Sequence, residues 1–238
     1  MYETYLDTII ELVKEMKDEQ ADAIEEAARL VADALLEGKK VFTFGSGHSQ
    51  LLAKEIRGRA GGLYPIINID DPLWGRAERV EGVGEVLVER VPMDPGDVIF
   101  VISNSGRNPE PLEVAIKARE RGLKVLTVTS LKHSKSVDSR HSSGKRLYEL
   151  GDVVLDTGTP AGDATLSIDG VEAKVGAVST VLGATILNAV MVEATKMIAD
   201  AGEEPPVLMS ANLDGSDAFN ERIKERYPRV SLMMGTFG

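Results

Sequence analysis

Residues 97–110 read DVIFVISNSGRNPE, and this change from an apolar run to a polar loop decides the fold. An unbroken apolar run of this length is typical of a strand that is covered on both faces. Asn108 is a good N-cap and Pro109 suits the first helical position, which predicts a helix over 109–121. Gly122 marks the end of that helix. The order of strand, loop and helix is typical of a parallel sheet.

The same order of elements repeats along the chain. Residues 40–44, KVFTF, predict an earlier strand, and GSGHS at 45–49 leads from it into a predicted helix over 49–60. Strands are predicted at residues 40–44, 63–69, 97–102, 124–129 and 152–155. Because these strands alternate with helices, we predict an α/β fold, a three-layer α/β/α arrangement around a doubly wound parallel sheet.

The two ends of the chain differ from this central pattern. Residues 1–37 place apolar side chains three and four positions apart, with a change of phase near Asp18, and predict two helices or one bent helix. Residues 205–238 predict a loop and one helix. We expect residues 1–238 to form a single domain, with 1–37 as an N-terminal helical segment and 205–238 as a C-terminal extension.

Residues 175–192 contain no charged side chain. The stretch is long enough to span a membrane, but its serine, threonine and asparagine side chains lower its hydrophobicity. We therefore predict a helix that is buried in the core or against a second subunit. A helix buried on all sides in so short a chain favours a homodimer or a homotetramer.

The composition limits the possible partners and the compartment. The chain has 27 basic residues against 38 acidic ones, a net charge of −11, and acidic proteins bind nucleic acids poorly. It contains no cysteine, and no basic region precedes an apolar one at its N-terminus, so we expect neither disulfides nor a signal peptide. We predict a cytoplasmic protein that binds no nucleic acid and no membrane. One segment, 132–146, is locally basic.

Polar loops follow the predicted strands at 40–44 and 97–102. Their small, hydroxyl-bearing residues allow a ligand to approach the backbone, and the helix that follows each loop favours an anion. The candidate binding residues are Gly45, Ser46, Gly47, Ser49, Ser103, Asn104, Ser105 and Asn108. The third glycine of a dinucleotide loop is missing, and no GKS or GKT follows a glycine loop. We therefore predict a small phosphorylated, or otherwise anionic, ligand and no cofactor.

These two loops resemble those of the SIS (sugar isomerase) domain over about residues 35–200, with Asn108 where that family more often has threonine. The whole chain resembles stand-alone bacterial SIS proteins, also at SRHSSGKRL, residues 139–147, and SANLDGSDAFN, residues 210–220. The resemblance implies a five-stranded flavodoxin-like sheet and a phosphosugar ligand. It also implies that the ligand faces Ser46, Ser49, Ser103, Ser105, Asn108 and Ser130.

Interconversion of an aldose and a ketose needs a base beside the carbonyl and a second group that handles the oxygens. Residues 53–62, AKEIRGRAGG, resemble the stretch of phosphoheptose isomerases that carries a glutamate base, and Glu55 occupies that position. An ion pair with Arg59 is the alternative interpretation of Glu55. Those enzymes use a histidine on the late helix, which has none here, so His48 and His141 are the candidates.

The leading hypothesis is a phosphosugar aldose–ketose isomerase that uses a glutamate base and serine-rich phosphate loops. Within the basic segment 132–146, Lys145 is a further candidate contact for the anion. No histidine spacing is typical of a metal site, so we predict none. Two alternatives stay open: a lyase or etherase acting on an amino-sugar phosphate, and a non-catalytic module that senses a phosphosugar.

Overall fold

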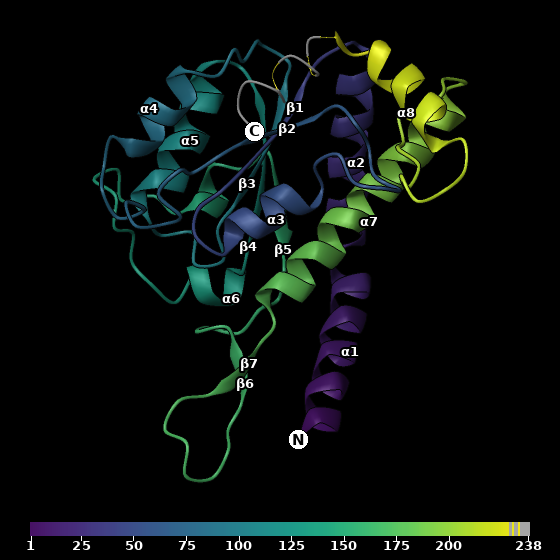
Figure 1. Ribbon diagram of the computed structural model, residues 1–238. Helices are drawn as coiled ribbons and strands as arrows, with labels where there is room; N and C mark the ends of the chain where they lie inside the picture. The colour runs from purple at the N-terminus through teal and green to yellow at the C-terminus, as the bar shows by residue number, and fades with distance from the viewer. Residues whose placement is uncertain (229, 231–232, 234–238) are drawn as a thin grey trace.

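Five parallel strands form the central sheet of the computed structural model, which describes residues 1–228, 230 and 233 (Figure 1). The strands are β1 (Val41–Gly45), β2 (Ile66–Ile69), β3 (Val98–Ile102), β4 (Lys124–Thr129) and β5 (Val153–Asp156). Their order is β2-β1-β3-β4-β5, so the direction of winding reverses between β1 and β3. The predicted parallel sheet is confirmed. Its second strand is shorter than expected because it begins only after Pro65, which has no N–H group to donate to a neighbouring strand.

Both faces of the sheet are covered, and alternate side chains of each strand enter two separate apolar cores. In β3, Val98, Phe100 and Ile102 join one core. Ile99 and Val101 join the other. All five side chains are buried, which explains why this strand is a continuous apolar run in the sequence.

Helices on the two faces complete the predicted three-layer architecture. One face is covered by α2 (Ala21–Leu36), α3 (Ser49–Glu55) and α7 (Ser179–Asp200). The other face carries α4 (Val83–Glu89) and α5 (Pro109–Glu120). Between β4 and β5 lie the short helix α6 (Leu131–Ser134) and the 3₁₀ helix η1 (Leu147–Glu149). Helix α3 ends earlier than the predicted helix over 49–60.

Helix α7 accounts for most of the uncharged stretch at 175–192. The first residues of that stretch instead form β7 (Val175–Ala177), which pairs with β6 (Ala164–Leu166) in a small antiparallel hairpin. By length and composition α7 is able to cross a membrane. In this structure it packs mainly against α2, whose small alanine side chains allow close contact, as in the core of a globular protein.

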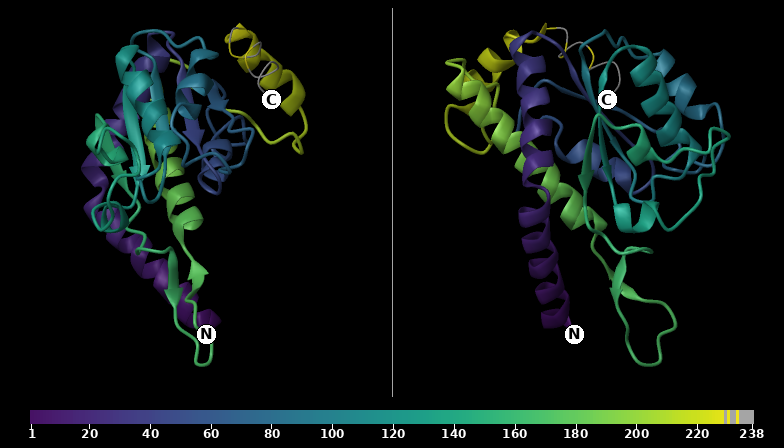
Figure 2. Two further views of the ribbon diagram at one scale, coloured as in Figure 1. Left: turned by 90° about the vertical axis from the view of Figure 1, so that its left-hand side faces the viewer. Right: turned by 180° about the vertical axis from the view of Figure 1, so that it is seen from behind.

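The N-terminal segment consists of two helices. α1 (Tyr2–Glu19) and α2 are separated by Gln20, where the apolar pattern of the sequence changes phase. Figures 1 and 2 show α1 extending past the sheet on the same side as the β6–β7 hairpin, and the Tyr5 hydroxyl donates to the carbonyl of Ala177 at 2.8 Å. Near the other end, α8 (Ser216–Glu225) packs Ile223 into the core shared with α4 and α5.

Candidate functional site

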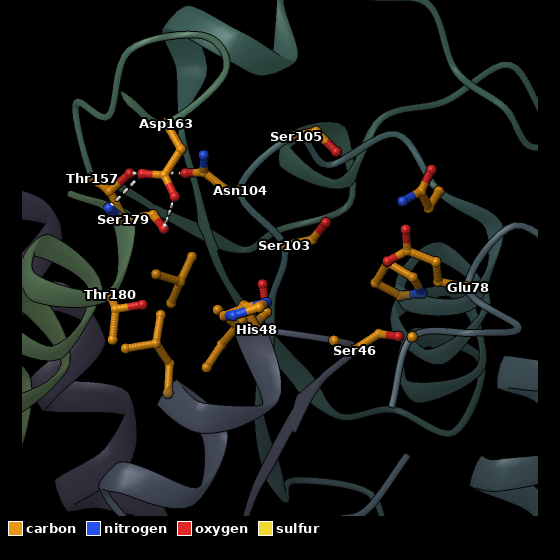
Figure 3. Close-up of a pocket in the computed structure, with 18 of the residues that line it drawn as sticks. Ser46, His48, Glu78, Ser103, Asn104, Ser105, Thr157, Asp163, Ser179 and Thr180 are labelled. Carbon is orange, nitrogen blue, oxygen red and sulfur yellow. Dashed lines mark hydrogen bonds between the residues drawn. The ribbon is translucent and has the colours of Figure 1, made fainter. Parts of the chain in front are cut away.

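A cavity of about 400 Å³ opens at the carboxyl ends of β1 and β3, where the strand order of the sheet reverses (Figure 3). In open parallel sheets ligands bind at this point, because the loops that follow the two strands diverge there. The volume lies within the range of small-molecule sites. The polar side chains in its lining are Ser46, His48, Ser49, Glu78, Ser103, Asn104, Ser105, Asn108, His133, Thr157, Asp163, Ser179 and Thr180.

The loop after β1, residues 46–49, forms one wall of the cavity. Within it Gly47 has a φ of 58° and packs against Gly75, whose φ is 77°. A Cβ atom on Gly75 would lie 2.9 Å from the Gly47 Cα atom, so only glycine allows the two segments to approach this closely. Gly45, the last residue of β1, is buried behind this loop and does not belong to the lining.

The loop after β3 forms a second wall. It contributes Ser103, Asn104, Ser105 and Asn108 to the lining. The Ser103 hydroxyl accepts a hydrogen bond from the backbone N–H of Gly106 at 3.2 Å, which folds the loop back toward the sheet. The Asn108 amide oxygen accepts from the Arg140 guanidinium at 2.9 Å, which brings a positive charge to the rim. Figure 3 shows Ser103 between Ser105 and Ser46.

Ser130, in the loop after β4, is buried and lies outside the lining. Its hydroxyl accepts from the backbone N–H of His133 at 3.0 Å and donates to the carbonyl of Thr159 at 2.5 Å. These bonds cap α6 and join it to the chain beyond β5. The side chain therefore holds the neighbouring residue His133 in place.

Glu55, His141 and Lys145 also lie outside the lining of this cavity. Glu55 is the last residue of α3 and forms an ion pair with Arg59, which is the alternative that the sequence allowed. His141 packs near α5, where its Nε2 atom lies 3.8 Å from a carboxylate oxygen of Glu113. The Lys145 side chain is exposed. Of the three catalytic candidates named from the sequence, His48 is the one that reaches the cavity.

Sequence reasoning assigned no role to three titratable side chains of the lining, Glu78, His133 and Asp163. The Nδ1 atom of His133 is buried and has no hydrogen-bond partner among the described residues. Burial lowers the pKa of His133, and the charge of the nearby Arg107 lowers it further. The imidazole is therefore neutral at pH 7 and able to accept a proton. The basic character of segment 132–146 was the only signal that pointed toward this histidine.

Asp163 lines the cavity beside Thr157 and Ser179 and caps helix α7 (Figure 3). Its carboxylate accepts from the backbone N–H groups of Val178 and Ser179 at 2.9 and 2.7 Å, and from the Ser179 hydroxyl at 2.7 Å. Anionic side chains are favourable at the positive end of a helix. Asp163 thus fixes the start of α7 against the cavity, and its two oxygens are occupied by these donors.

Two buried carboxyl groups share the Ser46 hydroxyl beneath the first loop. Ser46 Oγ lies 2.9 Å from Asp71 Oδ2 and 2.7 Å from Glu110 Oε2. A serine hydroxyl has one proton, so it donates to one carboxylate only, and the other contact needs a proton on the carboxyl side. Burial, reinforced by the charges of Asp71, Glu78 and Glu113, raises the pKa of Glu110 to about 7. Below about pH 7 Glu110 therefore carries a proton that it can donate to Ser46, while the Ser46 hydroxyl donates to Asp71.

Known proteins resemble this chain along most of its length. A UPF0309 protein of Listeria monocytogenes is 43% identical over 224 residues, which cover 94% of this chain and 96% of that protein. A UPF0309 protein of Streptomyces coelicolor is 40% identical over 234 residues, which cover 94% of this chain and 93% of that protein. These similarities therefore extend across the sheet, the polar loops after β1 and β3, and α7.

Solved structures share the fold at low sequence identity. Phosphoheptose isomerase GmhA of Neisseria gonorrhoeae superposes with a TM-score of 0.55 at 16% identity, covering 82% of this chain and 97% of the isomerase. The NanR protein of Vibrio vulnificus, solved with ManNAc-6P, gives a TM-score of 0.55 at 14% identity, covering 84% of this chain and 64% of NanR.

The family model for the SIS domain matches residues 4–130, which include β1, β3 and the loops that follow them. The chain therefore belongs to the SIS domain family, together with the bacterial UPF0309 proteins.

Proposed function

We propose that this protein binds a sugar phosphate in the cavity between β1 and β3 and interconverts its aldose and ketose forms. The observation that carries the proposal is the meeting of the two polar loops at the reversal point of the sheet. Membership of the SIS domain family and the fold shared with a phosphoheptose isomerase support the choice of substrate class. The reaction we propose needs no nucleotide cofactor.

The loop after β3 is the proposed phosphate site. Its serine hydroxyls are short donors that satisfy phosphate oxygens, and the dipole of the 12-residue helix α5 favours an anion beside its first turn. Arg140 adds a positive charge at the rim through its contact with Asn108. The sugar then extends toward the first loop, where His48 and Glu78 line the cavity.

Isomerisation through an enediol requires two proton transfers. One group takes the proton from C2 of the aldose and returns it to C1, while a second moves the hydroxyl proton from O2 to O1. We assign the first role to Glu78, because the other lining carboxylate, Asp163, is occupied in capping α7. We assign the second role to His133, since a neutral imidazole accepts and donates protons. His48 also lines the cavity and is the alternative.

The first experiment is a thermal-shift screen against aldose and ketose phosphates of five to seven carbons, together with acid-sugar phosphates and unphosphorylated parent sugars. Binding at 100 times Kd adds about 2.7 kcal/mol to the free energy of unfolding, which raises Tm by several degrees. Each sugar phosphate that binds is then incubated in D₂O. Deuterium on C1 or C2, measured by NMR, reports proton removal directly.

Two matched variants separate Glu78 from Glu55. We expect Glu78→Gln to bind the sugar phosphate with nearly unchanged affinity and to lose deuterium exchange, whereas Glu55→Gln keeps both. Exchange that is lost in Glu55→Gln and retained in Glu78→Gln would refute the assignment to Glu78. Binding by the wild type without exchange would favour a sensor, and release of lactate from N-acetylmuramate 6-phosphate would favour an etherase.

A further inference from the structure

The turn at residues 71–75, DPLWG, lies over the first loop and holds its tryptophan in an unusual conformation. Trp74 has a φ of 52°, in the left-handed region. Bulky side chains rarely adopt this region, because the Cβ atom approaches the backbone carbonyl too closely. Strain of this kind persists where the surrounding structure imposes it, and such positions cluster at ligand sites.

The Asp71 carboxylate imposes this conformation. Its Oδ1 atom accepts from the backbone N–H of Leu73 at 2.8 Å, and its Oδ2 atom accepts from the backbone N–H of Gly75 at 2.5 Å. The residues on both sides of Trp74 are therefore attached to one side chain. Asp71 is itself buried and accepts the Ser46 hydroxyl at 2.9 Å, so the turn and the first loop are joined.

The indole ring is not a core side chain. Trp74 lines the cavity, and 55% of the residue is exposed. The Lys54 ammonium lies 5.2 Å from the ring centroid, which restricts the ring from the side of α3. An aromatic ring that is solvated, oriented and held in a strained turn contributes little to folding. The same ring at the edge of a polar cavity offers a flat apolar surface to a ligand.

We propose that Trp74 is a specificity-determining residue, which packs its indole ring on the apolar C–H face of a sugar whose phosphate lies on the loop after β3. Asp71 is then a positioning residue that acts through Trp74. This inference rests on the proposed function, because it needs a sugar phosphate in the cavity. It adds that the protein distinguishes a phosphorylated sugar from phosphate alone at this ring.

The variant that tests the proposal is Trp74→Asn. Asparagine tolerates the left-handed region far better than tryptophan, so we expect an unchanged or higher Tm. The probes are the five- to seven-carbon sugar phosphates of the screen, with inorganic phosphate as the control. We expect the Kd of the sugar phosphate to rise about tenfold, since losing roughly 55 Å² of apolar contact suffices for that change. The Kd of inorganic phosphate should change less than about twofold, because phosphate binds the other wall.

The role of Asp71 is tested by a double-mutant cycle. Asp71→Asn removes one of the two carboxylate acceptors that hold the turn. In the otherwise wild-type protein we therefore expect this change to weaken binding of the sugar phosphate. If Asp71 acts through the indole ring, adding Asp71→Asn to the Trp74→Asn variant should change the Kd of the sugar phosphate little further. The effects of the two substitutions on the Kd will then not be additive. The chain has a single tryptophan, so its fluorescence in the wild type should change with sugar phosphate and not with inorganic phosphate.

Three other results would contradict the role of Trp74 or the proposed function. Equal affinity of Trp74→Asn and wild type for the sugar phosphate would remove Trp74 from specificity while leaving the proposed function in place. A lower Tm for Trp74→Asn would make the turn a structural element. If the wild type binds no sugar phosphate more tightly than inorganic phosphate, the proposed function and the role of Trp74 both fail.

Discussion

Replacing Glu110 with glutamine is predicted to remove a pH-dependent loss of stability. The Glu110 side chain is fully buried, and its Oε2 atom lies 2.7 Å from the Ser46 hydroxyl. Asp71, Glu78 and Glu113 all place negative charge around it, and burial is the largest cause of its raised pKa of about 7. Glutamine has the size of the protonated acid and also donates a hydrogen bond, but it does not ionise.

The direction of this pH dependence follows from the numbers of protons that the folded and unfolded chains bind. A folded-state pKa of about 7 against an ordinary 4.5 means that the folded chain holds a proton that the unfolded chain has lost. The free energy of unfolding therefore falls as the pH rises from about 4.5 to 7 and then levels off. At 1.36 kcal/mol for each unit of pKa, the full effect is about 3 kcal/mol, of which about 2 kcal/mol falls between pH 5.5 and 8.5.

Urea unfolding at pH 5.5, 7.0 and 8.5 measures this effect. The difference in free energy of unfolding between Glu110→Gln and the wild type should shift by about 2 kcal/mol in favour of the variant from the lowest to the highest pH. The matched control is Glu25→Gln, an exposed glutamate on α2, whose difference from the wild type should stay constant. Parallel stability curves for Glu110→Gln and the wild type would show that Glu110 is ionised in the folded protein, and the account of the Ser46 contacts would be wrong.

Three further substitutions test the packing and the site. Gly75→Ala should lower the free energy of unfolding by about 1–3 kcal/mol in urea titrations, because its Cβ atom would lie 2.9 Å from Gly47 and its φ is positive; an unchanged midpoint would contradict this. His133→Gln should fold normally and lose roughly 100-fold or more in turnover of the identified substrate. The wild-type rate should stay level to a pH below 6.5, because burial lowers the pKa of this histidine. Ile186→Ala, in the buried face of α7, should cost about 2–5 kcal/mol, and calorimetry should show a Tm lowered by several degrees.

The sheet could be predicted from the sequence because local signals agreed with the tertiary structure. The run at 98–102 is apolar throughout, and the structure buries its alternate side chains in two different cores. Asn108 and Pro109 marked the start of α5, which the structure places at Pro109. The region 71–90 gave no clear pattern, since most of it is a turn-rich segment whose geometry depends on the Asp71 side chain and on contacts with α5.

The two loops could be located from the sequence because parallel strands deliver their carboxyl ends to one edge. The residues that complete the cavity could not, since their partners are distant in the chain. Asp163 reaches α7 across a hairpin, and Glu78 enters from the segment before α4.

Glu55 shows that spacing along a helix does not by itself place a side chain in a site. It lies two turns after His48, but that is roughly 10 Å along the helix axis, and its carboxylate turns to Arg59 outside the cavity.

The charged side chains near the first loop differ from those near the second loop. Beneath the first loop lie Asp71 and Glu110, and protonation of Glu110, whose pKa is raised to about 7, removes one negative charge that would otherwise repel an anion. Beside the second loop lie the guanidinium groups of Arg107 and Arg140. Burial lowers the pKa of Arg140, and repulsion from Arg107 and Arg79 lowers it further, while the charge of Glu78 acts in the opposite direction. A phosphate beside Asn108 relieves that repulsion, whereas a phosphate beside Ser46 gains nothing from it. We therefore expect a sugar phosphate to bind with its phosphate at the loop after β3 and its carbonyl end toward the first loop. In the proposed reaction, that orientation would bring the reacting carbons toward Glu78.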